Sequence, residues 1–230
     1  MSQRKLSIIL PALNEEDTIG KVIDEIPRQA LEQKGYGVSI LVVDGNSTDR
    51  TREIAEDKGA VVMIEPRKGK GRAMRTAFKQ VKADFMFMLD ADYTYPGTHI
   101  PDMLDVLQQG YAVVIGSRLK GKREKGAMSR LNVVGNYLLT LMANILYWKR
   151  TSDLCTGCWG FRGEVLPNLR LVADGFDFEA ELFTQIAKKH YSMAEIPIYY
   201  RRRETAAKLS SLKDGIKIGW RLLAIRFQSP

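Results

Sequence analysis

The strongest constraint on the fold is a regular alternation between short apolar runs rich in β-branched residues and longer segments with helical periodicity. The runs predict strands at residues 6–10, 38–43, 60–64, 85–89 and 112–115. The segments between them predict helices at residues 16–33, 49–58, 69–81 and 98–109. This order favours an α/β fold with a mostly parallel sheet and helices on both faces. In such sheets, ligands bind beyond the carboxyl ends of the strands.

The second half of the chain is less regular. We expect a basic, flexible loop at residues 116–126, followed by a long helix at 129–148, a strand at 159–161 and a helix at 176–189. With 230 residues, of which 45% are hydrophobic, the chain suits one large domain with one core better than two small domains.

The excess of basic residues favours an anionic partner. The sequence holds 35 Lys and Arg against 27 Asp and Glu, a formal net charge of +8. Nucleotide phosphates, nucleic acid and an acidic membrane surface all fit this charge. The sequence shows no RNA-binding or zinc-finger motif, and its aromatic residues are not interleaved with the basic loops, which disfavours a nucleic-acid-binding protein.

The cysteine content indicates a reducing compartment. Cys155 and Cys158 are the only two cysteines, which excludes a disulfide framework. Their C-x-x-C spacing falls short of a zinc site, because two more ligands are needed and both histidines, His99 and His190, lie far away in the sequence. Residues 1–5 are polar and lead into the first predicted strand without an apolar leader. We therefore expect a cytoplasmic protein.

Two carboxylates follow the most apolar predicted strand. Residues 85–89, Phe-Met-Phe-Met-Leu, end directly in Asp90-Ala91-Asp92. Side chains two positions apart on an extended chain share a face, so both carboxylates point the same way. Paired carboxylates beside a diphosphate are what Mg²⁺ or Mn²⁺ requires. The sequence therefore predicts a metal site here, against the alternative of a solvated turn.

Polar residues also follow other predicted strands. Residues 11–15 follow the first strand, residues 44–47 the second and residues 116–118 the fifth. Asp44 is a candidate for hydrogen bonds to the ribose or base of a nucleotide, although capping of the next helix is an alternative role. The glycines and cations of residues 67–72 fit either an anion cradle or a solvated basic turn.

Seven segments, in order along the chain, resemble family 2 glycosyltransferases of the GT-A fold. The segments are LSIILPALNEE, LVVDGNSTDRT, RKGKGRA, MLDADYTYP, VIGSR, DLCTGCWGFR and EIPIYYRRRETAAKLS. They are most similar to the branch that transfers mannose or glucose to dolichyl or polyprenyl phosphate. We expect a single domain over residues 1–230. Its parts are a nucleotide-sugar and metal half at 1–118, an acceptor half at 119–208 and an amphipathic basic helix at 209–230.

The resemblance implies roles for individual residues. Those implied to bind the nucleotide sugar are Pro11, Leu13, Glu15, Asp44, Lys70, Asp90 and Ala91. Those implied to hold the metal are Asp90 and Asp92, and those implied to serve catalysis are Asp92, Arg118, Arg202 and Lys208. In the branch, an Arg and a Lys six positions apart lie on a loop that closes over the site, a spacing that Arg202 and Lys208 match. Thr94 stands where the branch commonly has a metal-binding Gln, which leaves the third protein ligand open.

The expected reaction is transfer of a hexose, with inversion, from GDP-mannose or UDP-glucose to a dolichyl or polyprenyl phosphate. A phosphate monoester has a second pKa of about 6, so it is largely dianionic at neutral pH and needs no general base. The alternative is a soluble transferase with a hydroxyl acceptor. That reaction requires a carboxylate base, for which Asp177, Glu179 and Glu181 are the candidates.

Two segments favour contact with a membrane surface. Residues 131–148 carry no charge and repeat apolar residues at helical spacing, but their asparagines and glycine make a poor membrane span. Core packing and an interfacial helix both fit them. Residues 212–227 interleave apolar residues with four cations, Lys213, Lys217, Arg221 and Arg226. Packing against the domain and contact of the remaining surface with anionic lipid both fit this segment. We expect peripheral association at the cytosolic membrane face, with a membrane-anchoring partner subunit as a further candidate.

Overall fold

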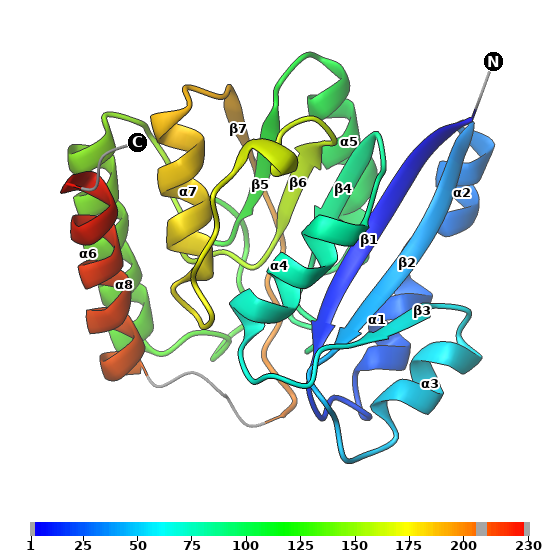
Figure 1. The fold of residues 1–230 in the computed structure, drawn as a ribbon. Helices are drawn as coiled ribbons and strands as arrows, with labels where there is room; N and C mark the ends of the chain where they lie inside the picture. Colours follow the sequence, from blue (N-terminus) through cyan, green and yellow to red (C-terminus); the bar gives the residue numbers. More distant parts are fainter. Residues whose placement is uncertain (1–2, 206–210, 228–230) are drawn as a thin grey trace.

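A seven-stranded sheet runs through the middle of the molecule, with helices on both faces (Figure 1). The computed structural model describes residues 3–205 and 211–227. Along the sheet the strands follow the order β3-β2-β1-β4-β6-β5-β7. Neighbouring strands are parallel, except that β6 runs antiparallel to β4 and β5. The predicted α/β class with a mostly parallel sheet is confirmed.

The elements follow the predicted order. The strands are β1 (Arg4–Ala12), β2 (Tyr36–Asp44), β3 (Val61–Ile64), β4 (Phe85–Met88), β5 (Val113–Ser117), β6 (Trp159–Arg162) and β7 (Met193–Pro197). The α-helices are α1 (Ile19–Glu25), α2 (Arg28–Gln33), α3 (Thr51–Asp57), α4 (Lys70–Gln80), α5 (Ile100–Gln108), α6 (Arg130–Tyr147), α7 (Phe178–Lys188) and α8 (Ser211–Phe227). Two short 3₁₀ helices are η1 (Gly97–His99) and η2 (Leu166–Asn168).

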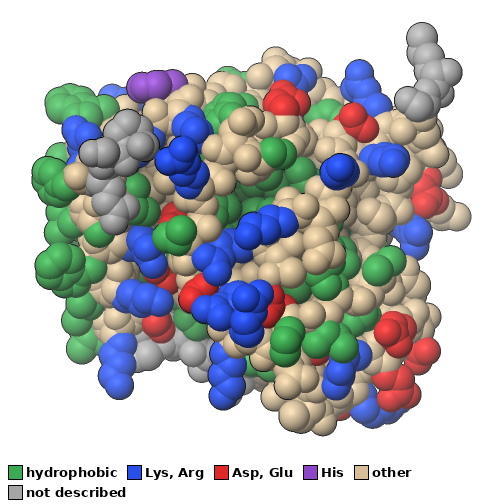
Figure 2. All heavy atoms as spheres, in the orientation of Figure 1, with side chains coloured by type: hydrophobic (Ala, Val, Ile, Leu, Met, Phe, Trp, Pro, Cys, Tyr) green, Lys and Arg blue, Asp and Glu red, His purple; other side chains and the backbone are tan. Residues whose placement is uncertain are grey.

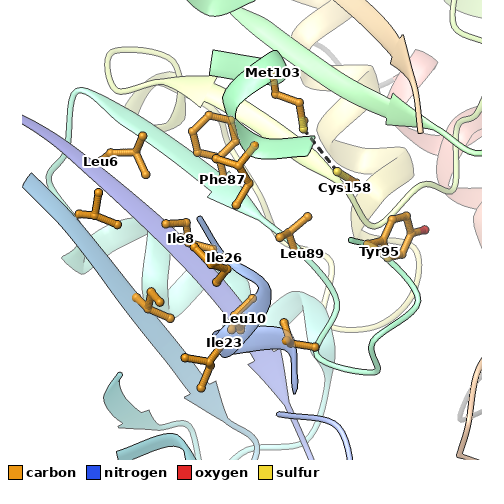
Figure 3. Close-up of a cluster of buried hydrophobic side chains, with 14 of the residues drawn as sticks. Leu6, Ile8, Leu10, Ile23, Ile26, Phe87, Leu89, Tyr95, Met103 and Cys158 are labelled. Atoms are coloured by element: carbon orange, nitrogen blue, oxygen red, sulfur yellow. Dashed lines mark hydrogen bonds between the residues drawn. The ribbon is translucent and has the colours of Figure 1, made fainter. Parts of the chain in front are cut away.

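The two faces of the sheet bury separate groups of side chains, because side chains alternate along each strand. On β1, Leu6, Ile8 and Leu10 point to the face that α1 and α5 cover, where they join Ile23 of α1 (Figure 3). Ile9, between them, points to the opposite face, which α4 and α7 cover. Burial on both faces fixes β1 in the middle of the sheet.

Two elements differ from the sequence-based prediction. The helix predicted at residues 16–33 is two helices, because Pro27 disfavours helical backbone at the residue before it and Ile26 is extended, with ψ 121°. The sequence does not reveal β7. The side chains of this strand are only half-buried or exposed, so neither an apolar run nor a clear alternation marks it.

The carboxyl ends of β1, β2 and β4 meet at one edge of the sheet. Ala12 is paired with Asp44, and β4 is the parallel neighbour on the other side of β1. The chain turns sharply beyond each of these ends, where Asn14, Asn46 and Tyr93 adopt left-handed backbone with φ of 49°, 67° and 64°. Residues other than glycine rarely adopt this conformation, and such positions cluster at functional sites.

Candidate active site

A pocket of about 320 Å³ opens at this edge of the sheet. Its lining residues are Pro11, Ala12, Leu13, Glu15, Gly45, Gly69, Lys70, Ala73, Asp90, Ala91, Asp92, Phe176 and Arg203. Every residue that the sequence assigns to the nucleotide sugar or the metal is among them except Asp44. Parallel strands thus bring together side chains that are up to about 80 positions apart in the sequence.

Lys70, the first residue of α4, bridges two carboxylates at the pocket. Its Nζ lies 2.5 Å from Asp90 Oδ1 and 2.5 Å from Glu179 Oε1. Burial alone would lower the pKa of Lys70, but the two carboxylates outweigh burial and raise this pKa above its ordinary value. Lys70 is therefore a permanent cation beside Asp90.

Arg203 bridges a second pair of carboxylates. Its guanidinium lies 3.1 Å from Asp92 Oδ2 and 3.0 Å from Glu15 Oε1. Burial and the charge of Asp90 raise the pKa of Asp92, whereas Arg203 opposes this shift. A buried Asp92 beside a second carboxylate, that of Asp90, thus favours positive charge in this pocket.

Thr94 orients Asp92. Its hydroxyl donates a hydrogen bond of 2.6 Å to Asp92 Oδ1, and its backbone N–H donates to the same oxygen at 3.2 Å. The side chain is buried and is not among the residues that line the pocket. At the position where the resembled branch commonly has a metal-binding Gln, this chain has a residue that holds a carboxylate in place.

Asp90 and Asp92 form a donor set that fits a divalent metal. Both supply hard carboxylate oxygens to one pocket, and Asp90 fits so tightly against Gly157 that a Cβ there would lie 2.3 Å from Asp90 Oδ2. Across the described residues, no three or more His, Cys, Asp or Glu side chains are grouped to hold a metal ion. Mg²⁺ often takes only one or two carboxylates and completes its coordination with substrate phosphates and water. Two aspartates therefore suit a metal that binds together with a diphosphate.

Asp44 lies beside the pocket rather than in its wall. The carboxylate is fully buried, accepts a hydrogen bond of 2.9 Å from the backbone N–H of Ser47, and lies 3.6 Å from Arg52 Nε. Its Oδ1 finds no hydrogen-bond donor within residues 3–205 and 211–227. Asp44 does not cap the next helix, because the N-cap of α3 is Arg50, and one carboxylate oxygen of Asp44 is left unsatisfied.

Arg118 is buried on the other half of the sheet. Its backbone N–H, Nε and Nη2 donate to the carboxylate of Asp153 at 2.9, 2.8 and 2.7 Å. Asn136 of α6 donates to the same carboxylate at 2.6 Å. The structure therefore does not bring Arg118 into the pocket. Instead, Arg118 binds the carboxylate of Asp153.

The three consecutive arginines after β7 have different environments. Arg201 pairs with Glu25 of α1, Arg202 is exposed, and Arg203 enters the pocket. These three residues also line a neighbouring hollow of about 380 Å³. Sequence reasoning selects Arg202 and misses Arg203. The run itself was visible in the sequence, but which arginine reaches the carboxylates depends on the path of the chain. Lys208 lies outside the described residues.

The three candidate bases all have other partners. Asp177 is ion-paired with cations of α8, and Glu179 is paired with Lys70. Glu181 accepts hydrogen bonds of 2.9 and 2.8 Å from the backbone N–H groups of residues 172 and 173. None of these three carboxylates lines the pocket.

The fold and the site together define a class of enzyme. The mostly parallel sheet with helices on both faces matches the GT-A fold of glycosyltransferases. The chain belongs to glycosyl transferase family 2, whose family model matches residues 7–170.

Named relatives agree with this assignment. Glycosyltransferase AglJ of Haloferax volcanii is 36% identical over 90% of this chain and 67% of its own length. Dolichyl-phosphate hexose transferase of the same organism is 34% identical over 93% of this chain and 90% of its own length. Glucosyl-3-phosphoglycerate synthase of Mycobacterium tuberculosis, solved with Mn²⁺, UDP and glucosyl-3-phosphoglycerate, has a TM-score of 0.76 at 23% identity. It matches 99% of this chain and 81% of that structure, which shows the fold.

Replacing Thr94 with Val should weaken metal-dependent donor binding by roughly ten-fold, because it removes one hydrogen bond to a carboxylate that is worth about 1.5 kcal/mol. Isothermal titration calorimetry of GDP or UDP into the protein, in the presence of Mn²⁺, measures this change in affinity. Thr98→Val is the matched control, since Thr98 is exposed. If the Thr94→Val variant and the original protein bind the nucleotide with equal affinity, Thr94 does not orient Asp92 for metal binding.

Proposed function

We propose that this protein is a metal-dependent, inverting hexosyltransferase that moves mannose or glucose from GDP-mannose or UDP-glucose to a dolichyl or polyprenyl phosphate. The observation that carries the proposal is the joint presence of Asp90, Asp92, Lys70 and Arg203 in one pocket. Two comparisons support it: a relative named dolichyl-phosphate hexose transferase, and a fold neighbour solved with Mn²⁺ and UDP.

The donor side follows from the charges of the pocket. Asp90 and Asp92 would hold Mg²⁺ or Mn²⁺, which supplies positive charge to the departing diphosphate. Lys70 and Arg203 add fixed positive charge beside the same carboxylates. Asp44 contributes its unsatisfied oxygen as an acceptor for a ribose hydroxyl or a base N–H.

The acceptor side follows from phosphate chemistry. An oxygen of the acceptor phosphate forms a bond to the anomeric carbon while the bond from that carbon to the diphosphate oxygen breaks, and the electron pair leaves with the nucleoside diphosphate. No proton has to be removed, because the acceptor is already anionic at neutral pH. We assign Arg202, exposed at the rim, and Lys208 to the charge of the acceptor phosphate. Arg118 supports this side through Asp153.

A hydroxyl acceptor is the competing proposal, with Glu179 as the base. Burial raises the pKa of Glu179 despite the opposing effect of Lys70, as a general base would need. However, this carboxylate is 2.5 Å from Lys70 and does not line the pocket. The phosphate acceptor therefore agrees better with the geometry.

The long helix α6 is built with its polar side inward. Asn136 donates to Asp153, Thr140 accepts from the backbone of Leu154, and Asn144 exchanges two hydrogen bonds with Thr151. The apolar repeat of Leu131, Val134, Leu138, Leu141 and Ile145 is exposed instead, whereas Leu139, Met142, Leu146 and Tyr147 pack against the core. A helix that covers a core shows the reverse arrangement. Core packing therefore does not account for the apolar repeat of α6.

The outward side chains of α6 and α8 form one apolar surface, the α6–α8 face. Its residues are Leu131, Val134, Tyr137, Leu138, Leu141, Ile145, Trp148, Leu212, Ile216, Trp220, Leu223 and Phe227. The two helices lie side by side at one edge of the molecule, and hydrophobic side chains gather along that edge (Figures 1 and 2). Among the helices that the structure describes, none is both long and apolar enough to cross a bilayer.

We propose that the α6–α8 face rests on the cytosolic surface of an anionic membrane. Exposed cations flank it, including Arg130 at the start of α6, Arg150 after its end and Lys213 on α8. Apolar area combined with flanking positive charge is the pattern of interfacial helices on anionic lipid. A lipid-linked acceptor requires such a location. If this face instead binds a membrane-anchoring partner subunit, the protein alone will not bind vesicles that contain no protein.

The reaction can be tested with labelled sugar nucleotide and dolichyl phosphate. We expect an organic-extractable, mild-acid-labile product that disappears when EDTA removes the metal. Asp92→Asn should lower transfer by at least about 100-fold, because metal stabilisation of the leaving group is worth several kcal/mol. Asp57→Asn, an exposed change on α3, should transfer normally. Transfer to a soluble hydroxyl acceptor, with none to dolichyl phosphate, would favour the competing proposal.

Membrane attachment can be tested by flotation with vesicles that contain an anionic phospholipid. The double substitution Leu138→Gln and Ile145→Gln, at side chains 62% and 63% exposed, should reduce vesicle binding by roughly ten-fold or more. Val61→Gln is the control, because Val61 is equally exposed, at 63%, but lies on β3. Binding that survives the double substitution would exclude this face.

A further inference from the structure

Asp177, immediately before α7, is a buried carboxylate held by two cations of α8. Its side chain is 0% exposed, Lys217 Nζ lies 2.9 Å from Oδ1, and Arg221 Nη2 lies 2.7 Å from Oδ2. Burial alone would raise the pKa of Asp177, but Lys217 and Arg221 outweigh burial and lower it. We call these three residues the α8 clamp. Of the basic stripe, Arg221 and the half-exposed Lys217 therefore contact the protein.

The segment that the clamp holds is part of the donor pocket. Phe176, next to Asp177, lines the pocket. Asp174 lies against the start of α4, where its backbone oxygen accepts a hydrogen bond of 3.2 Å from the N–H of Arg72. A Cβ at Gly69 would lie 2.0 Å from that oxygen, so the two segments are in close contact. Residues 174–177 are thus fixed between α4 and α8.

The clamp is also connected to the aspartates of the site. Glu179 lies in the first turn of α7, two positions after Asp177, and its carboxylate is 2.5 Å from Lys70 Nζ. Lys70 is in turn 2.5 Å from Asp90. Ion pairs thus link α8 to Asp177 and link Glu179 through Lys70 to Asp90, and the first turn of α7 joins the two sets.

Attachment of α8 does not by itself require buried charge. Ile218, Leu222 and Ile225 are already buried against the domain, and the hydroxyl of Tyr147 donates a hydrogen bond of 2.7 Å to the backbone oxygen of Leu222. Buried ion pairs contribute little net stability compared with apolar packing, but they specify one geometry. The clamp therefore fixes how α8 meets the start of α7.

We infer that Asp177, Lys217 and Arg221 are positioning residues for the donor, through which α8 sets the placement of Phe176 and of the Lys70–Glu179 pair. This inference rests on the proposed function, since the ligand to be positioned is a nucleoside diphosphate sugar. Because α8 also forms part of the α6–α8 face, the surface proposed to meet lipid is linked to donor binding by the same ion pairs.

The test measures donor binding without lipid. Lys217→Gln and Arg221→Gln should each weaken Mn²⁺-dependent binding of GDP or UDP, whichever the original protein binds, by roughly ten-fold. The KM for the sugar nucleotide should rise by the same factor while kcat changes by less than about two-fold. Lys217, whose side chain is 51% exposed, is the variant that least disturbs folding.

Two controls separate positioning from stability. Arg221→Lys keeps the charge and should recover most of the donor affinity, and Arg226→Gln, an exposed change on the same helix, should bind like the original protein. A loss of kcat with unchanged nucleotide affinity would mean fewer folded molecules and would overturn the inference. If the original protein binds neither GDP nor UDP, the proposed function fails as well. If it binds one of them and Lys217→Gln binds equally tightly, only the inference fails.

Discussion

Two cations bridge two pairs of carboxylates at the edge of the sheet, and the site depends on this balance. Asp92 is buried next to the charge of Asp90, and both effects penalise its charged form unless positive charge lies against it. Lys70 and Arg203 supply it from α4 and from the segment after β7. In the folded site, the charged form of these aspartates therefore depends on cations from elements that are distant in sequence. The same positive charge favours a diphosphate in the pocket.

In the second half of the chain, polar side chains of helices make hydrogen bonds and ion pairs with buried groups. Asn136, Thr140 and Asn144 of α6 satisfy buried groups around Asp153 and Thr151, and the apolar residues on the opposite side of α6 are exposed. On α8 the division is the same, because Lys217 and Arg221 turn inward to Asp177. One requirement, to satisfy buried charge and buried backbone groups, thus produces both the α8 clamp and the α6–α8 face.

The carboxylates of the pocket were readable from the sequence because their position depends on local order. An apolar strand followed by Asp90-Ala91-Asp92 places both carboxylates at a strand end, and parallel neighbours bring Leu13 and Glu15 to the same edge. Arg203 was not readable, because Arg201, Arg202 and Arg203 are chemically equal and only their three-dimensional path separates them. Strand β7 was not predicted, because a strand whose side chains are half-buried or exposed shows no strong periodicity of apolar residues.

By itself, the sequence determined the α/β class, the positions of most strands and helices, and the aspartates of the pocket, because periodicity and strand-end residues act over a few positions. Only the tertiary structure decided which cations meet those aspartates, that Thr94 orients Asp92, and that α6 turns its polar side inward. These features depend on desolvation and on contacts between segments as far apart as Glu15 and Arg203. Such contacts form only when the chain folds, so no short-range sequence pattern predicts them.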